Sequence, residues 1–238
     1  MAERCQWVHQ ELECLPRVNA AFKVERLPED GIYFLYEEGE LWGHGGNKPR
    51  IVRVGINRGN GNFQSRIAEH FLLDDSKMSF DVTKPAPHER SIFRKNLGRA
   101  LLNRANDPYL KVWEYNFTSK DNREQFGKLR DLEHERAVEL EVTGLLRDRF
   151  SFRFVLVQER EEREELECAL IGTIAHCGFC KPSAQWLGNF SPKAEIRQSG
   201  LWLVQHLGSA GFCGQGAEKK FKEAIRRTRV WVQEQLVV

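Results

Sequence analysis

The sequence predicts an α+β protein built on a small antiparallel sheet of three strands flanked by helices. Three short stretches rich in apolar and β-branched residues predict the strands, at residues 31–36, 50–56 and 150–157. Longer segments in which apolar residues recur every three or four positions predict the surrounding helices. The 238 residues contain no internal repeat and no flexible linker, so we expect a single α+β domain with a helical insertion and a C-terminal helix.

The chain opens with a predicted helix over residues 3–22, where apolar residues follow the helical period. A turn at residues 27–30 leads into the first two strands, which form a half-buried hairpin. Their connection contains several glycines and is longer than a tight turn.

A short helix is predicted over residues 63–73, with Asn62 placed as its N-cap. Arg66 and His70 are four residues apart and therefore share one flank of this helix, next to its apolar stripe. This pattern fits a surface arginine beside a half-buried histidine, or a functional pair. The buried stripe itself consists of Phe63, Ile67 and Phe71.

The remaining elements follow from periodicity and helix-breaking residues. FSFRFVLV is the clearest strand of the sequence. The helix after it has Glu167 beside its apolar stripe of Leu166, Leu170 and Ile174, where a carboxylate can reach a cleft and hold a hard cation. In chain order we expect a helix over 88–106, a strand over 111–117, a helix over 122–147, a strand over 150–157, a helix over 158–177, loops over 178–200 and a helix over 217–235.

The composition gives no strong global charge: 29% of the residues are charged and the formal net charge is +2. A nucleic-acid partner therefore requires a local basic patch, which arginine-dense segments could supply, although such segments are commonly solvated helix faces. No apolar run is long enough to span a membrane, and the N-terminus lacks the apolar core of a signal peptide. We expect a cytoplasmic protein whose six cysteines are reduced.

An ordered set of motifs resembles the GIY-YIG nuclease family. Gly31-Ile32-Tyr33 matches the first signature, and Arg53-Val54-Gly55 stands at the second. Arg66 and His70 match the family's Arg-x-x-x-His helix, and Glu167 matches its metal-binding glutamate. The resemblance covers residues 29–73 and 150–176, and the segment 91–102 is similar to a stretch in some other members.

The resemblance implies a Mg²⁺-dependent DNA endonuclease, with Mn²⁺ as an alternative metal, which leaves a 5′ phosphate and a 3′ hydroxyl. Glu167 would hold the metal, and Arg66 would neutralise the scissile phosphate. Tyr33 would act as the base or in a relay to it, and His70 would orient the water or Tyr33. DNA is the expected partner, with no membrane and no nucleotide cofactor.

The second signature departs from the family pattern, because Arg53 replaces the usual tyrosine and arginine cannot act as a base. Either Tyr33 acts without that partner, or Tyr36 or another group substitutes, or the chain is a non-catalytic nucleic-acid-binding module. Gly31 and Gly55 are expected to leave room for a phosphate backbone. The predicted nucleic-acid contacts are Arg53, Arg58, Arg94 and Lys95.

The resemblance also divides the chain into three parts. Residues 1–26 form a helical extension, residues 27–200 form the nuclease domain with an insertion at about 74–149, and residues 201–238 form a C-terminal helical segment. The insertion either recognises DNA or only packs around the core. Asn189 is a candidate for a position near the active site, whereas Trp186 and Trp202 are expected in the core.

A Cys-x-x-Cys pair, Cys177 and Cys180, lies outside this scheme. The pair has three possible roles: ordinary packing, redox chemistry or zinc binding. A structural zinc ion requires four ligands, and His176, His206 and Cys213 are the candidates to complete the set.

Overall fold

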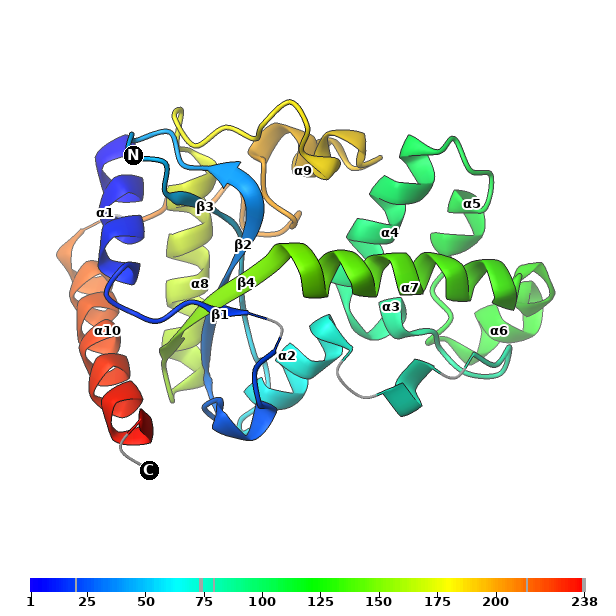
Figure 1. Cartoon of the computed structure of the whole chain (residues 1–238), viewed down its shortest axis with the longest axis horizontal. Helices are drawn as coiled ribbons and strands as arrows, with labels where there is room; N and C mark the ends of the chain where they lie inside the picture. Colours follow the sequence, from blue (N-terminus) through cyan, green and yellow to red (C-terminus); the bar gives the residue numbers. More distant parts are fainter. Residues whose placement is uncertain (20, 73–74, 79, 213, 237–238) are drawn as a thin grey trace.

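The computed structural model describes residues 1–19, 21–72, 75–78, 80–212 and 214–236, and it is built on an antiparallel sheet (Figure 1). In the described chain this sheet has four strands rather than the expected three, in the order β1-β4-β2-β3. The strands are β1 (Val18–Asn19), β2 (Gly31–Leu41), β3 (Pro49–Ile56) and β4 (Phe150–Leu156).

The additional strand comes from a segment for which the sequence predicted a helix. The first helix, α1 (Ala2–Leu12), ends well before residue 22, and Pro16 lies in the segment between it and β1. Val18 and Asn19 then pair with Phe152 and Ser151 of β4. A two-residue strand is too short to show a recognisable alternation of apolar and polar residues, so it could not be predicted.

The side chains of β2 alternate between two cores on opposite faces of the sheet. Ile32 and Phe34 face the core formed with α1, α8 (Arg160–Ala175) and α10 (Gln215–Leu236). Tyr33 and Leu35 face the second core, formed with α2 (Phe63–Phe71) and the helical lobe described below. Figure 1 shows α1, α8 and α10 gathered on one side of the sheet and the lobe extending away from the other. The predicted stripes of α2 and α8 are buried as expected.

The helical lobe differs from the sequence prediction in three places. The helix expected over 88–106 is divided at Ser91, the segment 111–117 is not a strand, and the helix expected over 122–147 is divided near residue 130. Trp113 accounts for the second difference. Its indole packs so closely on Gly98 that a Cβ atom at that position would lie only 2.3 Å from the ring. The segment that carries Trp113 makes this contact as a short helix. The lobe consists of α3 (Pro87–Arg90), α4 (Ile92–Arg104), α5 (Leu110–Trp113), α6 (Lys120–Phe126) and α7 (Leu132–Arg149), with short 3-10 turns at Asp75–Met78 and Gly127–Leu129.

The segment that follows α8 covers the β3 side of the sheet. The backbone N–H of Trp202 donates to the Val52 carbonyl of β3 at 2.8 Å. The indoles of Trp186 and Trp202 both donate to the Glu37 carboxylate, at 2.9 and 3.0 Å, and both rings are buried. The segment contains the 3-10 turn Leu187–Phe190 and α9 (Ala194–Ser199), and another 3-10 turn, Val24–Arg26, precedes β2.

Among the described residues, no helix is both long enough and apolar enough to cross a lipid bilayer.

Candidate functional site

Tyr33 of β2 lies across the neighbouring strand because Gly55 has no side chain. The two residues are register partners, and a Cβ atom on Gly55 would lie 2.3 Å from the Tyr33 hydroxyl oxygen. A Cβ atom on Gly31 would likewise lie 2.6 Å from the Val155 carbonyl oxygen. The expectation that these glycines leave room for a phosphate backbone is therefore wrong, since the protein itself fills both spaces.

The Tyr33 hydroxyl belongs to a buried chain of polar groups. It lies 2.7 Å from Nε2 of His70 on α2, and Nδ1 of the same ring lies 2.7 Å from the Ser91 hydroxyl. Ser91 is also the N-cap of α4, where its oxygen accepts the backbone N–H of Arg94. Both ring nitrogens of His70 are therefore engaged, which fixes the orientation of the imidazole.

His70 is held in its neutral form. Its side chain is fully buried, and this burial lowers its pKa well below the ordinary value of 6.5. The positive charges of Arg66, Arg53 and Arg94 lower the pKa further. His70 therefore holds Tyr33 as an uncharged hydrogen-bond partner at neutral pH.

A cavity of about 600 Å³ opens at this position. Arg66, on the exposed flank of α2, lines it and donates to the Arg90 carbonyl at 3.0 Å. Arg58, in the loop after β3, is exposed and donates to the Gln205 side chain at 3.3 Å. The lining brings a tyrosine, three glutamates and four arginines around one space: Tyr33, Glu69, Glu89, Glu167, Arg53, Arg58, Arg66 and Arg90.

Glu167 of α8 faces the same cavity as Tyr33, although the two come from elements more than one hundred residues apart. Among the described residues, no side chain forms a hydrogen bond or an ion pair with its carboxylate. Partial burial raises its pKa above the ordinary 4.5, and nearby positive groups, Arg53 foremost, act in the opposite direction. An unpartnered carboxylate on a cavity wall has oxygen atoms available for a cation.

Arg53 occupies a buried position on β3 rather than the position of a surface cation. Its guanidinium donates to the Trp202 carbonyl and lies over the Phe93 ring, 5.2 Å from the centroid. Its Nε atom is buried and has no partner in the described structure. Arg53 nevertheless lines the cavity, so it brings positive charge close to Glu167.

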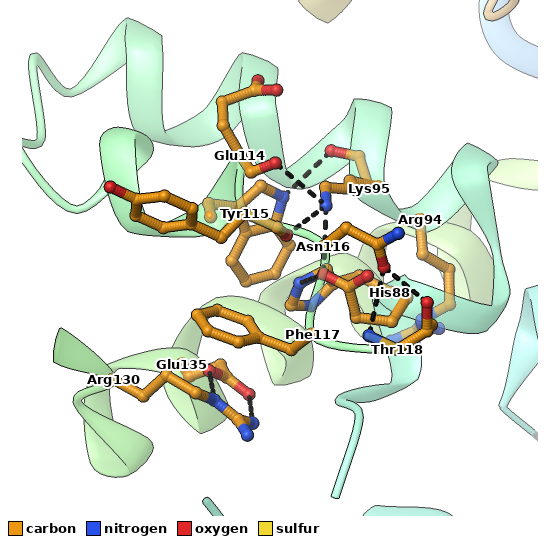
Figure 2. A network of polar contacts seen from close by, with 12 residues as sticks. His88, Arg94, Lys95, Glu114, Tyr115, Asn116, Phe117, Thr118, Arg130 and Glu135 are labelled. Atoms are coloured by element: carbon orange, nitrogen blue, oxygen red, sulfur yellow. Dashed lines mark hydrogen bonds and ion pairs between the residues drawn. The ribbon is translucent and has the colours of Figure 1, made fainter. Parts of the chain in front are cut away.

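Two of the predicted nucleic-acid contacts are buried in the lobe instead. Arg94 is fully buried and donates to both Oε2 and the backbone carbonyl of Glu139. Lys95 donates to Glu89 at 3.0 Å. It also donates to the Tyr115 carbonyl at 2.8 Å, a contact that Figure 2 shows. Their positive charges are committed to internal partners, so we leave both residues out of the interface.

Two other candidates lie away from the cavity. Tyr36 faces the α1 side of the sheet, where it is buried and its hydroxyl has no partner among the described residues. It therefore cannot substitute for a tyrosine in the second signature. Asn189 donates to the carbonyls of Ser183 and Ala184, at 2.9 and 3.2 Å, and thereby holds its own loop.

Sequence reasoning missed Asn96 of α4, which lines the cavity. Its Oδ1 accepts a hydrogen bond from Arg99, whereas its buried Nδ2 has no partner in the described structure. A donor left unpaired beside a polar cavity is a candidate for binding an oxygen atom of a ligand. The signal in the sequence was weak, because only its position in the segment 91–102 pointed to it.

Comparison with known protein families gives one match. The family model of the GIY-YIG domain matches residues 8–230, which include both signature strands, α2, α8 and the lobe between them. Neither curated proteins nor solved structures gave a match. The matched family carries nuclease activity in general. With its signature residues around one cavity and a match over most of its length, the chain belongs to the GIY-YIG nuclease family.

Proposed function

We propose that the protein is a Mg²⁺-dependent DNA endonuclease whose active site is the cavity between Tyr33, Arg66 and Glu167. The observation that carries this proposal is that all three side chains line one cavity, with the Tyr33 hydroxyl 2.7 Å from a neutral histidine. Phosphodiester hydrolysis needs a base for the attacking water and positive charge at the phosphate. The cavity supplies both kinds of group.

The residues present fit one magnesium ion. Mg²⁺ is commonly bound through one or two carboxylates together with water and substrate phosphate. Glu167 offers such a carboxylate, unpaired and facing the cavity. When bound there, the metal would act as a Lewis acid on the phosphate.

The arginines around the cavity would bind and neutralise the phosphate. Arg66 is a quarter exposed, and its weak contact with Glu69, at 3.5 Å, leaves donors for an anion. Arg58 lies on the rim, where it would contact the DNA backbone. Arg53 is more buried and would add a fixed charge behind the phosphate.

The hydrogen bonds around His70 suit Tyr33 as the base or a relay to it. Ser91 accepts the Arg94 N–H, so its own hydroxyl proton is free for Nδ1 of His70. In the tautomer in which Ser91 donates to Nδ1, the imidazole proton is on Nε2 and is donated to the Tyr33 oxygen. Tyr33 then directs its own proton toward the cavity, and His70 would stabilise the oxygen when that proton leaves.

A non-catalytic nucleic-acid-binding module is the second candidate, and Arg53 is the observation that favours it. An arginine at the second signature cannot accept a proton, and it competes with a metal for the charge of Glu167. Such a module would bind DNA through Arg53, Arg58 and Arg66 without cleaving it.

Plasmid nicking with Mg²⁺ separates the two candidates. We expect the wild-type protein to nick supercoiled DNA, and Glu167→Ala to abolish the activity. Removing the Tyr33 hydroxyl in Tyr33→Phe should lower the rate about 10²- to 10⁴-fold, the usual contribution of a positioned acid or base.

Matched variants control for effects on folding. Tyr36→Phe removes a buried hydroxyl on the opposite face of the sheet, and Glu164→Ala removes an exposed acid of the same helix, paired only with Arg160 in the described structure. Both should nick DNA at the wild-type rate. DNA binding without nicking by the wild-type protein would favour the binding module.

A further inference from the structure

Four metal-ligating side chains meet on the opposite side of the sheet from the Tyr33–His70 pair. Cys5 comes from α1, His44 from the β2–β3 connection, and Cys177 and Cys180 from the turn after α8. One ligand atom of each residue lies within 4.8 Å of the ligand atoms of the other three. The three cysteines are buried and His44 is partly exposed.

Two of the ligand–ligand distances match the edges of a zinc tetrahedron. Bond lengths of about 2.3 Å to sulfur and 2.0–2.1 Å to nitrogen put two sulfurs about 3.8 Å apart, and a sulfur and a nitrogen about 3.6 Å apart. The sulfurs of Cys5 and Cys180 are 3.7 Å apart, and the Cys177 sulfur is 3.4 Å from Nε2 of His44. A disulfide needs about 2.05 Å between sulfurs, so Cys5 and Cys180 are not bonded to each other.

The backbone is packed so that His44 reaches the cysteines. A Cβ atom on Gly43 would lie 1.8 Å from the Phe179 carbonyl oxygen, so only glycine allows the two loops to approach this closely. The rings of Trp42 and Phe179 contact the His44 ring, with centroids 5.4 and 5.7 Å away. These contacts orient the imidazole toward Cys177.

His9 adjoins the cluster without being a ligand. Its Nε2 accepts the backbone N–H of Ile51 at 3.2 Å, so its proton is on Nδ1 and is donated to the Cys5 carbonyl at 2.9 Å. Both nitrogens are thus used. The ring fixes the backbone that carries Cys5 in the way that outer-shell groups fix metal ligands.

We propose that Cys5, His44, Cys177 and Cys180 bind one structural Zn²⁺ ion. Three thiolates and one imidazole are a closed tetrahedral set with no open position for a substrate, which is typical of a structural zinc site. The ion joins α1, the β2–β3 connection and the end of α8. The inference is independent of the nuclease proposal, because the two sites share no residue.

The ligands that complete the Cys-x-x-Cys pair differ from those the sequence suggested. His176 is exposed and is not part of the cluster, and His206 contacts Cys168 instead, with 3.2 Å between Nδ1 and sulfur. Cys213 lies outside the described residues. Cys5 and His44 gave no signal, because they are separated from the pair by more than one hundred residues of sequence.

Metal analysis of the full-length protein tests the site. Protein purified without chelator should contain one zinc ion per chain by mass spectrometry, released by a mercurial reagent that blocks thiols. Cobalt-substituted protein should show the intense visible bands of a tetrahedral thiolate complex. Removing zinc should lower Tm by on the order of 10 °C, because a structural metal contributes to folding.

Variants locate the ligands, with matched controls. Cys177→Ser, Cys180→Ser and His44→Ala should lose the zinc, whereas His44→Cys should retain it. Cys14→Ser, Cys168→Ser and His176→Ala alter the same residue types outside the cluster and should keep one ion per chain. If the cysteine variants fail to fold, the zinc content of the wild-type protein and of the His44 variants still tests the proposal, because His44 is partly exposed.

Three results would overturn the proposal. The first is wild-type protein without metal whose Tm does not rise when Zn²⁺ is added. The second is a disulfide among these cysteines in protein purified under reducing conditions, which would indicate a redox pair. The third is iron or copper in place of zinc.

Discussion

Gly55 shows how one absent side chain positions the proposed base. The tyrosine ring of β2 crosses β3 where any other residue would place a Cβ atom, 2.3 Å from the hydroxyl oxygen. The glycine of the second signature is therefore a packing requirement of Tyr33. This role persists although Arg53 has replaced the signature tyrosine two positions earlier.

Gly55→Ala should impair activity and stability together. The added methyl group must displace the Tyr33 ring, and overpacking of this kind costs about 1–3 kcal/mol. Urea unfolding and single-turnover nicking measure the two effects. Gly144→Ala is the control, since that helical position has no neighbour within 4 Å and should gain about 0.5–1 kcal/mol. An unchanged nicking rate in Gly55→Ala would show that the ring position is unimportant.

The pH dependence of cleavage should follow Glu167 and not His70. Because the pKa of Glu167 is raised, its carboxylate protonates at a higher pH than an ordinary glutamate, and metal binding is lost as the pH falls through that value. His70 has a pKa well below 6.5, so it stays neutral and adds no loss there. Single-turnover rates measured across acidic pH should fall with a single acid limb.

The metal concentration distinguishes these two groups. Protons and Mg²⁺ compete for the Glu167 carboxylate, so more Mg²⁺ should move the midpoint of the acid limb to lower pH. A midpoint near pH 6.5 that does not change with the Mg²⁺ concentration would contradict the assignment of the acid limb to Glu167 and would indicate a histidine.

At the scale of elements, Ser91 links the lobe to the proposed active site. It separates α3 from α4, caps α4, and holds Nδ1 of His70 with the same hydroxyl. A helix boundary that would otherwise be only structural thus determines the orientation of a histidine beside the proposed base.

Ser91→Ala should reduce nicking, whereas Ser119→Ala should not. Both serines are N-caps, so each variant should cost about 1 kcal/mol of unfolding free energy. Ser91→Ala also leaves Nδ1 of His70 without its partner, which costs about 1–3 kcal/mol more. Urea unfolding and single-turnover rates provide the comparison, and equal rates in both variants would rule out a positioning role for Ser91.

Elements with a strong local pattern could be predicted from the sequence. The hairpin strands, the helix from Phe63 and the strand after residue 149 lie where periodicity put them. The prediction of secondary structure failed where contacts between residues distant in the sequence determine the local conformation. Segment 111–117 has the apolar content of a strand, yet Trp113 becomes helical as it packs on Gly98, and the break at Ser91 depends on a cap that a continuous helical pattern conceals.

At the scale of the whole molecule, several basic residues neutralise buried acids. Arg94 pairs with Glu139, 45 residues away, and Arg130 pairs with Glu135, seen at the lower edge of Figure 2. The sequence could not reveal these ion pairs, because an arginine-dense helix has the same sequence pattern whether it faces water, DNA or a buried carboxylate. The candidate residues of the site could be named from the sequence because their order along the chain resembles the motifs of the GIY-YIG nuclease family.

Arg94 and Arg58 should therefore respond oppositely to replacement. Arg94→Met removes the arginine from the buried Glu139 carboxylate and leaves His88 as its remaining partner, which should cost about 3–5 kcal/mol of unfolding free energy. Arg58→Met should leave stability within about 0.5 kcal/mol of wild type, because the side chain is exposed.

For DNA binding we expect the reverse: Arg58→Met should change the salt dependence of the affinity, and Arg94→Met should not. Losing one phosphate contact in Arg58→Met should make the plot of log affinity against log salt shallower by about 0.9. Folded Arg94→Met, assayed at low temperature, should keep the wild-type slope. An unchanged slope in Arg58→Met would remove Arg58 from the interface.

The junction between lobe and sheet has a mechanical consequence. α7 ends at Arg149 and β4 begins at Phe150, so the longest helix of the lobe continues without a linker into a central strand (Figure 1). No loop residue lies between the two elements, so the position of α7 is tied directly to β4, whose Phe154 is the register partner of Tyr33.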